Sequence, residues 1–323
     1  MDNRETILKE AIGTSDFRSA GGYLNAEQST RFLRGVIDQP TILKAARSVI
    51  IDGETKKIEK IGFGSRIMRP GIENVALTSD KYAKPTFGKV DIATKEVIAE
   101  VRLSYDTLEA NIERAQLKNT IMHMIQERVA LDLEELIIQG ATDNVADEYL
   151  AIINGYLKLA DDHIVDALGS EINLSLLTNL IKSVPQKYIR DAAAWRMYTS
   201  RNIDLAWKQQ IASRNTVAGD RFLLSDTNAT ALGFQIHPIA MMPEDLTYEG
   251  LSTPEDNGSL GQILFTHPQN LIVGFTRKVQ IETDKDISAR QHIIVVTMKI
   301  DAVIEETDAV GKLVNVSTTY TPT

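Results

Sequence analysis

The residues best suited to chemistry in this 323-residue chain are its five histidines, but their spacing does not indicate a metal site. No two of them stand in an HxH or HExxH pattern, the spacings that bring two imidazoles to one ion. Asp161-Asp162-His163 could form a carboxylate–imidazole pair, yet adjacent residues rarely converge on one point, so we expect a surface loop. His123 is expected in a structural position in a helix, and His237 and His267 are expected at strand ends; His292 opens a strand-rich stretch.

Phosphate-binding and nucleophile motifs are also missing from the sequence. There is no GxxxxGK[ST] loop and no GxSxG elbow. Gly62-Phe63-Gly64-Ser65 resembles part of a glycine-rich phosphate loop, but it lies in an alternating extended stretch and opens no helix. The chain has no cysteine, which excludes disulfides, thiolate zinc sites and a cysteine nucleophile. We therefore expect no catalytic, cofactor-binding or metal-binding residues, and no enzyme.

Composition and charge indicate a soluble globular protein. Hydrophobic residues make up 43% and charged residues 24% of the chain. The net charge of −9 argues against a generic nucleic-acid binder, which needs a basic face to displace counterions. No run of eighteen apolar residues and no signal-peptide pattern is present, so we expect neither a membrane span nor secretion, and a cytoplasm-like compartment.

The N-terminal third divides into an arm and a long hairpin. Residues 1–49 mix short helical and turn patterns. Residues 50–104 alternate apolar and polar side chains in two extended segments separated by a polar loop, and Asp52-Gly53 is a hairpin turn signal. A lone two-stranded hairpin is marginal in water, so it must lie either on its own domain or on a neighbouring subunit.

The clearest element is a helix predicted over 116–139. Apolar residues recur every three or four positions, and Gly140 supplies a stop. Asp106 is a candidate cap of a shorter helix before it, with Glu109 three residues on. The stripe is expected to face a core and consists of Leu117, Ile121, Ile125, Val129, Leu133 and Leu136.

The rest of the chain alternates helix and strand patterns and then becomes strand-rich. Helices are expected over 175–190, interrupted or ended near Pro185, and over 201–214; strands are expected in AAAWRMYTS, LGFQIHPIAMMP and QILFTHPQNLIVGF. Residues 243–261, rich in Gly, Pro, Ser and Asp, read as a loop. Residues 275–316 alternate as strands with a turn at 309–312, and residues 172–272 read as an insertion in a discontinuous domain.

The order of these elements resembles the major capsid proteins of tailed bacteriophages. The resemblance rests on GGYLNAEQ, VRLSYDTLEANIERAQL, ELIIQG, AWRMYTS, QILFTHPQNLIVGFTRKVQIE and HIIVVTMKIDAVIEETDAV in that order, from Gly21 to Val316. It implies an α+β fold, the Johnson fold, with an N-terminal arm (1–49), an extended β-hairpin loop (50–104), a peripheral domain with a long spine helix (105–165 and 273–323) and an inserted axial domain (166–272).

The resemblance also implies a function and partners. Copies of the chain would assemble into pentamers and hexamers of an icosahedral shell around a phage genome, as part of the virion, after assembly in the host cytoplasm. Packaged double-stranded DNA would be non-specific content. The short segment before Gly21 implies either a separate scaffolding protein or a built-in scaffold that has already been cleaved off, and a portal is a further expected partner. Some members crosslink a hairpin lysine to an asparagine; here Lys81, Lys84, Lys89 and Lys95 are expected as lysines of a solvated ribbon, and no crosslink to Asn315 is assigned.

Two other functions stay open at this stage. An encapsulin-type nanocompartment shell shares the fold and encloses cargo enzymes, and a soluble enzyme with an unrecognised site would be a monomer. We expect closed particles in negative-stain images, with Gly21-Gly22, Gly71 and Pro85 as joints that let one sequence occupy different shell positions.

Overall fold

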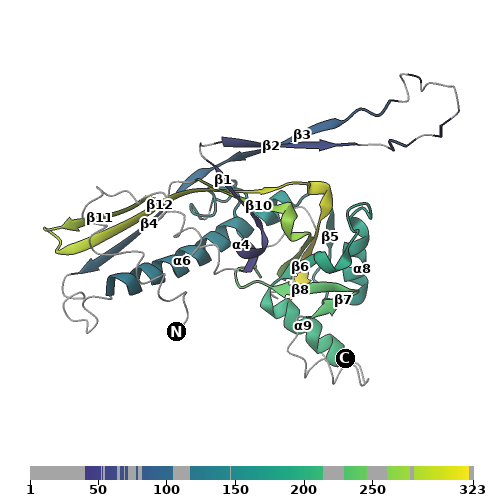
Figure 1. Ribbon diagram of the computed structural model, residues 1–323. Coiled ribbons are helices and arrows are strands. Elements are labelled where there is room, and N and C mark those ends of the chain that lie inside the picture. The colour runs from purple at the N-terminus through teal and green to yellow at the C-terminus, as the bar shows by residue number, and fades with distance from the viewer. Residues whose placement is uncertain are drawn as a thin grey trace, which may run out of the picture.

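The chain folds around two β-sheets, from one of which a two-stranded ribbon projects (Figure 1). The structure is a computed structural model. It describes residues 41–51, 53, 55–63, 66–68, 70, 71, 78, 82–104, 117–145, 147–213, 229–245, 260–276 and 280–319. The expected arm up to residue 40, the capping pair Asp106 and Glu109, most of the loop 243–261, and Gly64, Ser65 and Lys81 lie outside these residues.

The first sheet is built around one long strand, β12 (Gln291–Ile304). Along one edge β12 pairs antiparallel with β4 (Lys95–Ser104), from Gln291↔Ser104 to Ile300↔Lys95. The other edge pairs with β11 (Gln280–Asp286) and then β10 (Leu271–Thr276). A parallel strand, β1 (Arg47–Ile51), completes the sheet beyond β10. Apolar residues at alternate positions of β12 are therefore turned to one face, as the sequence pattern predicts.

The long helix α6 (Leu117–Gln139) covers that face (Figure 1). Its predicted stripe is confirmed at Ile125, Val129, Leu133 and Leu136, which are buried with alternate residues of β12. The side chains of Leu117 and Ile121 lie outside the described part of the structure. The short helix α4 (Thr41–Ala45) contributes buried Ile42 and Leu43 to the same core, so residues 41–49 of the expected arm pack on the body.

The second sheet has six strands in the order β5-β13-β9-β6-β8-β7. One face packs under two helices, and the other contributes Tyr198, Leu264 and Val310 to the first core. The helices are α8 (Leu174–Ser183) and α9 (Arg201–Ala212), and a further short helix is α7 (Tyr156–Leu159). The strands are β5 (Ile164–Asp166), β13 (Val310–Ser317), β9 (Leu260–Thr266), β6 (Arg196–Thr199), β8 (Phe234–Pro238) and β7 (Thr230–Ala231).

Both helices begin where polar side chains can cap them. The Asn173 side chain accepts a hydrogen bond from the Leu176 backbone N–H at 2.8 Å, and the Ser200 hydroxyl accepts one from Ile203 at 3.4 Å. Such caps satisfy amides that have no partner within the helix. The predicted helices are confirmed, and α8 ends before Pro185 as expected.

Three sequence expectations about turns and strands were wrong. Gly53 does not lie in a hairpin turn, because β1 pairs with β10 while β2 (Thr55–Gly62) pairs with β3 (Thr86–Ala93). The predicted turn at 309–312 lies earlier, in a 3-10 turn at Thr307–Ala309, and residues 310–312 begin β13. QILFTHPQNLIVGF is not one strand: a 3-10 turn at Pro268–Asn270 sends β9 and β10 into different sheets.

The sheet membership of β13 also differs from the expected division of the chain. We expected residues 273–323 to join the long helix, but β13 pairs with β9 and β5 in the six-stranded sheet. Alternation predicts a strand at these positions but not its partner, because both sheets offer a buried apolar face.

Candidate functional site: exposed interaction surfaces

The most exposed apolar surface lies on the ribbon, defined here as β2 and β3. Its register runs from Thr55↔Ala93 to Gly62↔Thr86. Ile61 and Phe87 are cross-strand partners near the end away from the body, and they are 69% and 70% exposed. Phe63, Ile67, Met68 and Tyr82 continue this exposed apolar character beyond the paired residues. Large apolar side chains gathered in this way mark an interaction site in soluble proteins.

The other end of the ribbon is fixed to the body. Ile92 is fully buried against Ile51 and Ile272. Gly274 allows this approach, because a Cβ there would lie 2.6 Å from the Ile92 Cγ2. The Ala93 backbone N–H donates to the Asp301 carboxylate at 2.7 Å, and burial raises the pKa of Asp301. The ribbon thus has a packed base and an uncovered far end.

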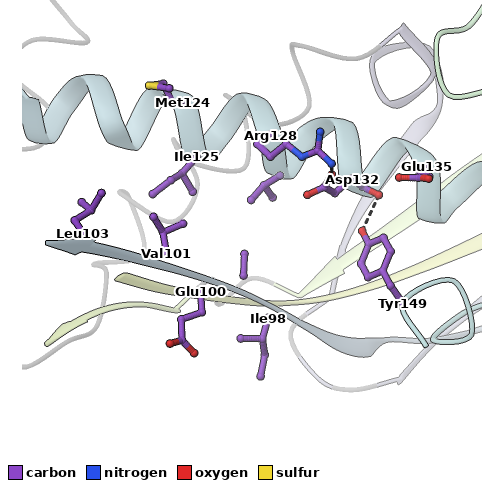
Figure 2. Close-up of a pocket in the computed structure, with 12 residues that line it drawn as sticks. Ile98, Glu100, Val101, Leu103, Met124, Ile125, Arg128, Asp132, Glu135 and Tyr149 are labelled. Carbon is purple, nitrogen blue, oxygen red and sulfur yellow. Dashed lines mark hydrogen bonds and ion pairs between the residues drawn. The ribbon is translucent and has the colours of Figure 1, made fainter. Parts of the chain in front are cut away.

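A second exposed surface is a groove of about 660 Å³ between β4 and α6 (Figure 2). Val101 and Leu103 on β4 and Ile125 on α6 point into it, whereas the exposed side chains of Ile98 and Met124 point away from it (Figure 2). At one end the Arg128 guanidinium pairs with Asp132 at 2.8 Å, and the Tyr149 hydroxyl donates to the Asp132 backbone carbonyl at 2.6 Å. The groove is also lined by Ala99, Glu100, Val129 and Glu135.

The histidines lie apart from one another in the described structure. His163 contacts Asp308 at 3.2 Å, where Lys187 also lies 3.1 Å from the carboxylate and lowers the Asp308 pKa. Thus His163, expected in a surface loop, contacts a carboxylate 145 residues away in the sequence. His237 is on β8, where burial lowers its pKa, and His267 begins the 3-10 turn after β9.

The remaining candidates are equally scattered. His292 is on β12, and His123 is in α6 with its side chain outside the described part. Among the described residues, no three His, Asp or Glu side chains group as a metal site would need. Gly62 and Phe63 lie on the exposed ribbon end, and Lys84, Lys89 and Lys95 on the ribbon or its connections. Asn315 is buried in β13. No described helix is long and apolar enough to span a membrane.

Sequence reasoning missed three ionisable residues that make long-range contacts: Glu134 and Lys312 are buried, and Asp301 is half-buried. Glu134 on α6 accepts the Ile42 backbone N–H at 3.2 Å, and burial raises its pKa. Lys312 on β13 donates to the Leu157 carbonyl at 2.9 Å, and burial lowers its pKa to about 8. Asp301 anchors the ribbon. Each occupies an ordinary charged position in its local pattern, so only the tertiary contacts identify it.

Comparisons with known proteins agree on a fold and a family. Residues 21–315 match the family described as Phage capsid family. A curated relative from Bacillus subtilis (strain 168), named "Putative prophage capsid protein YqbE", is 46% identical over 316 residues, which cover 98% of this chain and 99% of the relative.

Solved structures with low sequence identity share the fold. The satellite phage P4 procapsid matches with a TM-score of 0.58 at 13% identity, over 90% of this chain and 99% of that one. The capsid of the native GTA particle matches with 0.59 at 14% identity, over 88% and 91%. The holo-SrpI encapsulin complex from Synechococcus elongatus PCC 7942 matches with 0.55 at 11% identity, over 85% and 87%.

Proposed function

The chain belongs to the phage capsid family, and from that premise we propose that its copies assemble into pentamers and hexamers of a closed icosahedral head. It is a structural protein of a capsid shell, and its place is the virion capsid. The observation that supports the proposed assembly most directly is the ribbon, whose far end carries the exposed pair Ile61 and Phe87. Another copy would bury this surface, which the subunit itself leaves in water.

The ribbon also differs in charge from the rest of the chain. Its two strands, residues 55–62 and 86–93, contain four Lys against two Asp and Glu, a net charge of 4 − 2 = +2, and with the segment between them (55–93) the net charge is 8 − 4 = +4, whereas the whole chain carries −9. A basic apolar ribbon is therefore attracted to the acidic surface of a neighbouring copy. This complementarity supports a ribbon that lies on a sister subunit.

The finer division of the subunit follows the same proposal. The five-stranded sheet with α6 forms the peripheral domain, and the six-stranded sheet, including β13, forms the axial domain around local symmetry axes. The proposed partners are a separate scaffolding protein and a portal, with double-stranded DNA as non-specific content. Assembly takes place in the host cytoplasm, and the protein has no catalytic role. A net charge of −9 supports a wall that does not grip the genome.

The test is assembly of the purified chain, followed by negative-stain imaging and sedimentation velocity. We expect closed particles from the parent chain. The double variant Ile61→Ser/Phe87→Ser should keep a folded subunit, because both side chains are already exposed, but should lose particles. The matched control is Glu59→Ser/Lys89→Ser, the neighbouring cross-strand pair on the same ribbon face, which should still assemble. A monomeric parent chain at micromolar concentration would contradict the proposal.

A second candidate is an encapsulin-type shell, because the SrpI encapsulin shares the fold. The two functions differ in what the particle holds. Particles isolated from the native host should contain DNA and no abundant co-purifying enzyme. Mass spectrometry that finds one cargo enzyme in every particle, with no DNA, would favour the compartment.

A further inference from the structure

Two exposed leucines occupy backbone conformations that leucine disfavours. Leu168 has φ of 53° and precedes Gly169 at 73°, and Leu232 has φ of 52° and precedes Gly233 at 88°. Left-handed backbone brings Cβ too close to the following carbonyl, so asparagine and glycine are the usual residues there. The two leucines are 59% and 51% exposed. Each turn therefore combines a strained backbone with an apolar side chain in water.

Leu168 is pushed outward at one edge of the six-stranded sheet. On either side of it, the Ala167 and Gly169 backbone N–H groups each donate at 2.9 Å to β13, at Val314 and Asn315. The Leu168 backbone N–H donates a hydrogen bond to the Asp166 carboxylate at 2.9 Å. This segment lies directly after β5, the edge strand in the order β5-β13-β9-β6-β8-β7. The Ser170 N–H donates to the Ala167 carbonyl at 2.9 Å, so Leu168 and Gly169 are the two central residues of a tight turn beside β13, and the Leu168 side chain is exposed.

Leu232 lies at the opposite edge of the same sheet. The pair Ala231↔Phe234 closes a two-residue turn of Leu232 and Gly233 between β7 and β8. Two positive φ values make this a type I′ turn, whose first position favours asparagine or glycine. β7 ends the strand order on this side. Both edges of one sheet therefore present a leucine in the same disfavoured conformation.

The charges of the two edges show which of them can meet. Residues 161–171, around Leu168, contain four acidic side chains and no Lys or Arg. Residues 229–242, around Leu232, contain no acidic side chain, and Arg196 on the adjacent strand pairs in register with Gln235. Two β5 edges facing each other would oppose like charges, whereas a β5 edge facing a β7 edge would not.

We propose that Leu168 and Leu232 are contact residues of a head-to-tail interface, in which the β5 edge of one copy meets the β7 edge of the next. Repetition of this contact closes a ring when the rotation between copies closes. Burial of both leucines by the neighbouring copy offsets the cost of their exposure and strain. The inference rests on the proposed assembly into rings and assigns the surfaces that form them.

Cysteine crosslinking tests the geometry directly, because the natural chain has no cysteine. Assembled Leu168→Cys, Leu232→Cys and the double variant are treated with a short flexible bismaleimide and run on denaturing gels. We expect a ladder up to the ring size from the double variant, dimers from a mixture of the two single variants, and monomer from either single variant alone. Crosslinked dimers from a single variant would overturn the head-to-tail arrangement, and particles without any crosslink would overturn the contact itself. A ladder without closed particles would instead contradict the shell and leave the contact standing.

Substitution by asparagine separates folding from assembly. Leu168→Asn and Leu232→Asn relieve strain, so the urea midpoint of the unassembled subunit should stay equal or rise. The concentration at half assembly should nevertheless rise at least tenfold for each variant. Arg290→Asn is the matched control, since Arg290 has φ of 53° in the turn between β11 and β12, away from both edges. Assembly of both leucine variants at the parent concentration, or an equal loss with Arg290→Asn, would overturn the assignment.

Discussion

At the residue scale, Lys312 shows how a charge can be buried without a signal in the sequence. Local pattern placed it in a polar turn, but β13 carries it into the interior, where it is 2% exposed and donates to the Leu157 carbonyl at 2.9 Å. Burial lowers its pKa from 10.5 to about 8, because the charged amine loses hydration. At neutral pH, where Lys312 is protonated, its burial therefore lowers the stability of the native state.

Lys312→Met should stabilise the unassembled subunit at pH 7 by about 2 kcal/mol. Lowering the pKa of Lys312 from 10.5 to about 8 destabilises the native state by roughly 3 kcal/mol, at about 1.36 kcal/mol per pKa unit. The variant recovers this free energy but loses one hydrogen bond, which costs about 1 kcal/mol. Because the pKa of Lys312 is lower in the folded than in the unfolded state, burial of the charged amine lowers stability by its full amount below about pH 8. This loss of stability falls to zero above pH 10.5. Urea denaturation at pH 7, 8.5 and 10 should show the advantage of the variant shrinking as pH rises. A difference that is constant with pH would contradict this assignment.

Gly140 is required for a close approach of backbones at the end of α6. A Cβ there would lie 2.5 Å from the Leu136 carbonyl oxygen and 2.6 Å from that of Ile153. We expect Gly140→Ala to lower the free energy of unfolding by about 2–3 kcal/mol, because backbone on both sides must move. Gly53→Ala is the control, since nothing lies within 4 Å of a Cβ there, and it should change stability by less than about 0.5 kcal/mol. If urea denaturation showed equal changes in the free energy of unfolding for the two substitutions, the close approach of backbones at Gly140 would be contradicted.

At the element scale, periodicity predicted elements better than it predicted their partners. The 3.6-residue stripe of α6 and the alternation of β12 are strong local signals, and both elements formed as expected. The hairpin turn at Gly53 failed, because a turn signal between two strands does not say that those strands pair. β1 finds a parallel partner in β10, more than two hundred residues away. The exposed ribbon was predictable as extended chain, whereas its anchor at Asp301 was not.

The two ends of the ribbon should respond differently to truncation. Ile92→Ala at the base should destabilise the unassembled subunit by about 2–4 kcal/mol, because Ile92 is fully buried against Ile51 and Ile272. Ile61→Ala near the far end should cost less than about 0.5 kcal/mol, because Ile61 already lies in water. Urea midpoints of the two variants measure this contrast. A large loss from Ile61→Ala would mean that the ribbon packs on its own subunit.

At the scale of the whole molecule, the two sheets share a core. Tyr198 and Leu264 belong to the six-stranded sheet but pack with α6 and β12, while Met197 and Phe265 on the opposite face pack under α8 and α9. The chain also crosses directly between the sheets from β9 to β10 and from β12 to β13. Sequence analysis suggested an insertion in a discontinuous domain, but a shared core follows only from contacts between distant segments.

This shared core should make the described body unfold as one unit. Both tryptophans of the chain, Trp195 and Trp207, lie in the core under α8 and α9, so their fluorescence follows the six-stranded sheet. Far-UV circular dichroism follows both sheets. We expect the two urea transitions of the unassembled subunit to coincide. A fluorescence change that precedes the dichroism change would show that the six-stranded sheet melts separately.

The join between β3 and β4 has a mechanical consequence. Only Thr94 separates the ribbon's returning strand from β4, which is paired with β12 over ten consecutive residues. The hydrogen bonds of an antiparallel ladder run across the strands, so tension drawn along β4 loads them together in shear instead of opening them one by one. A pull on the ribbon is therefore transmitted into β12, the longest strand in the described part of the chain, and the load is borne by many bonds at once.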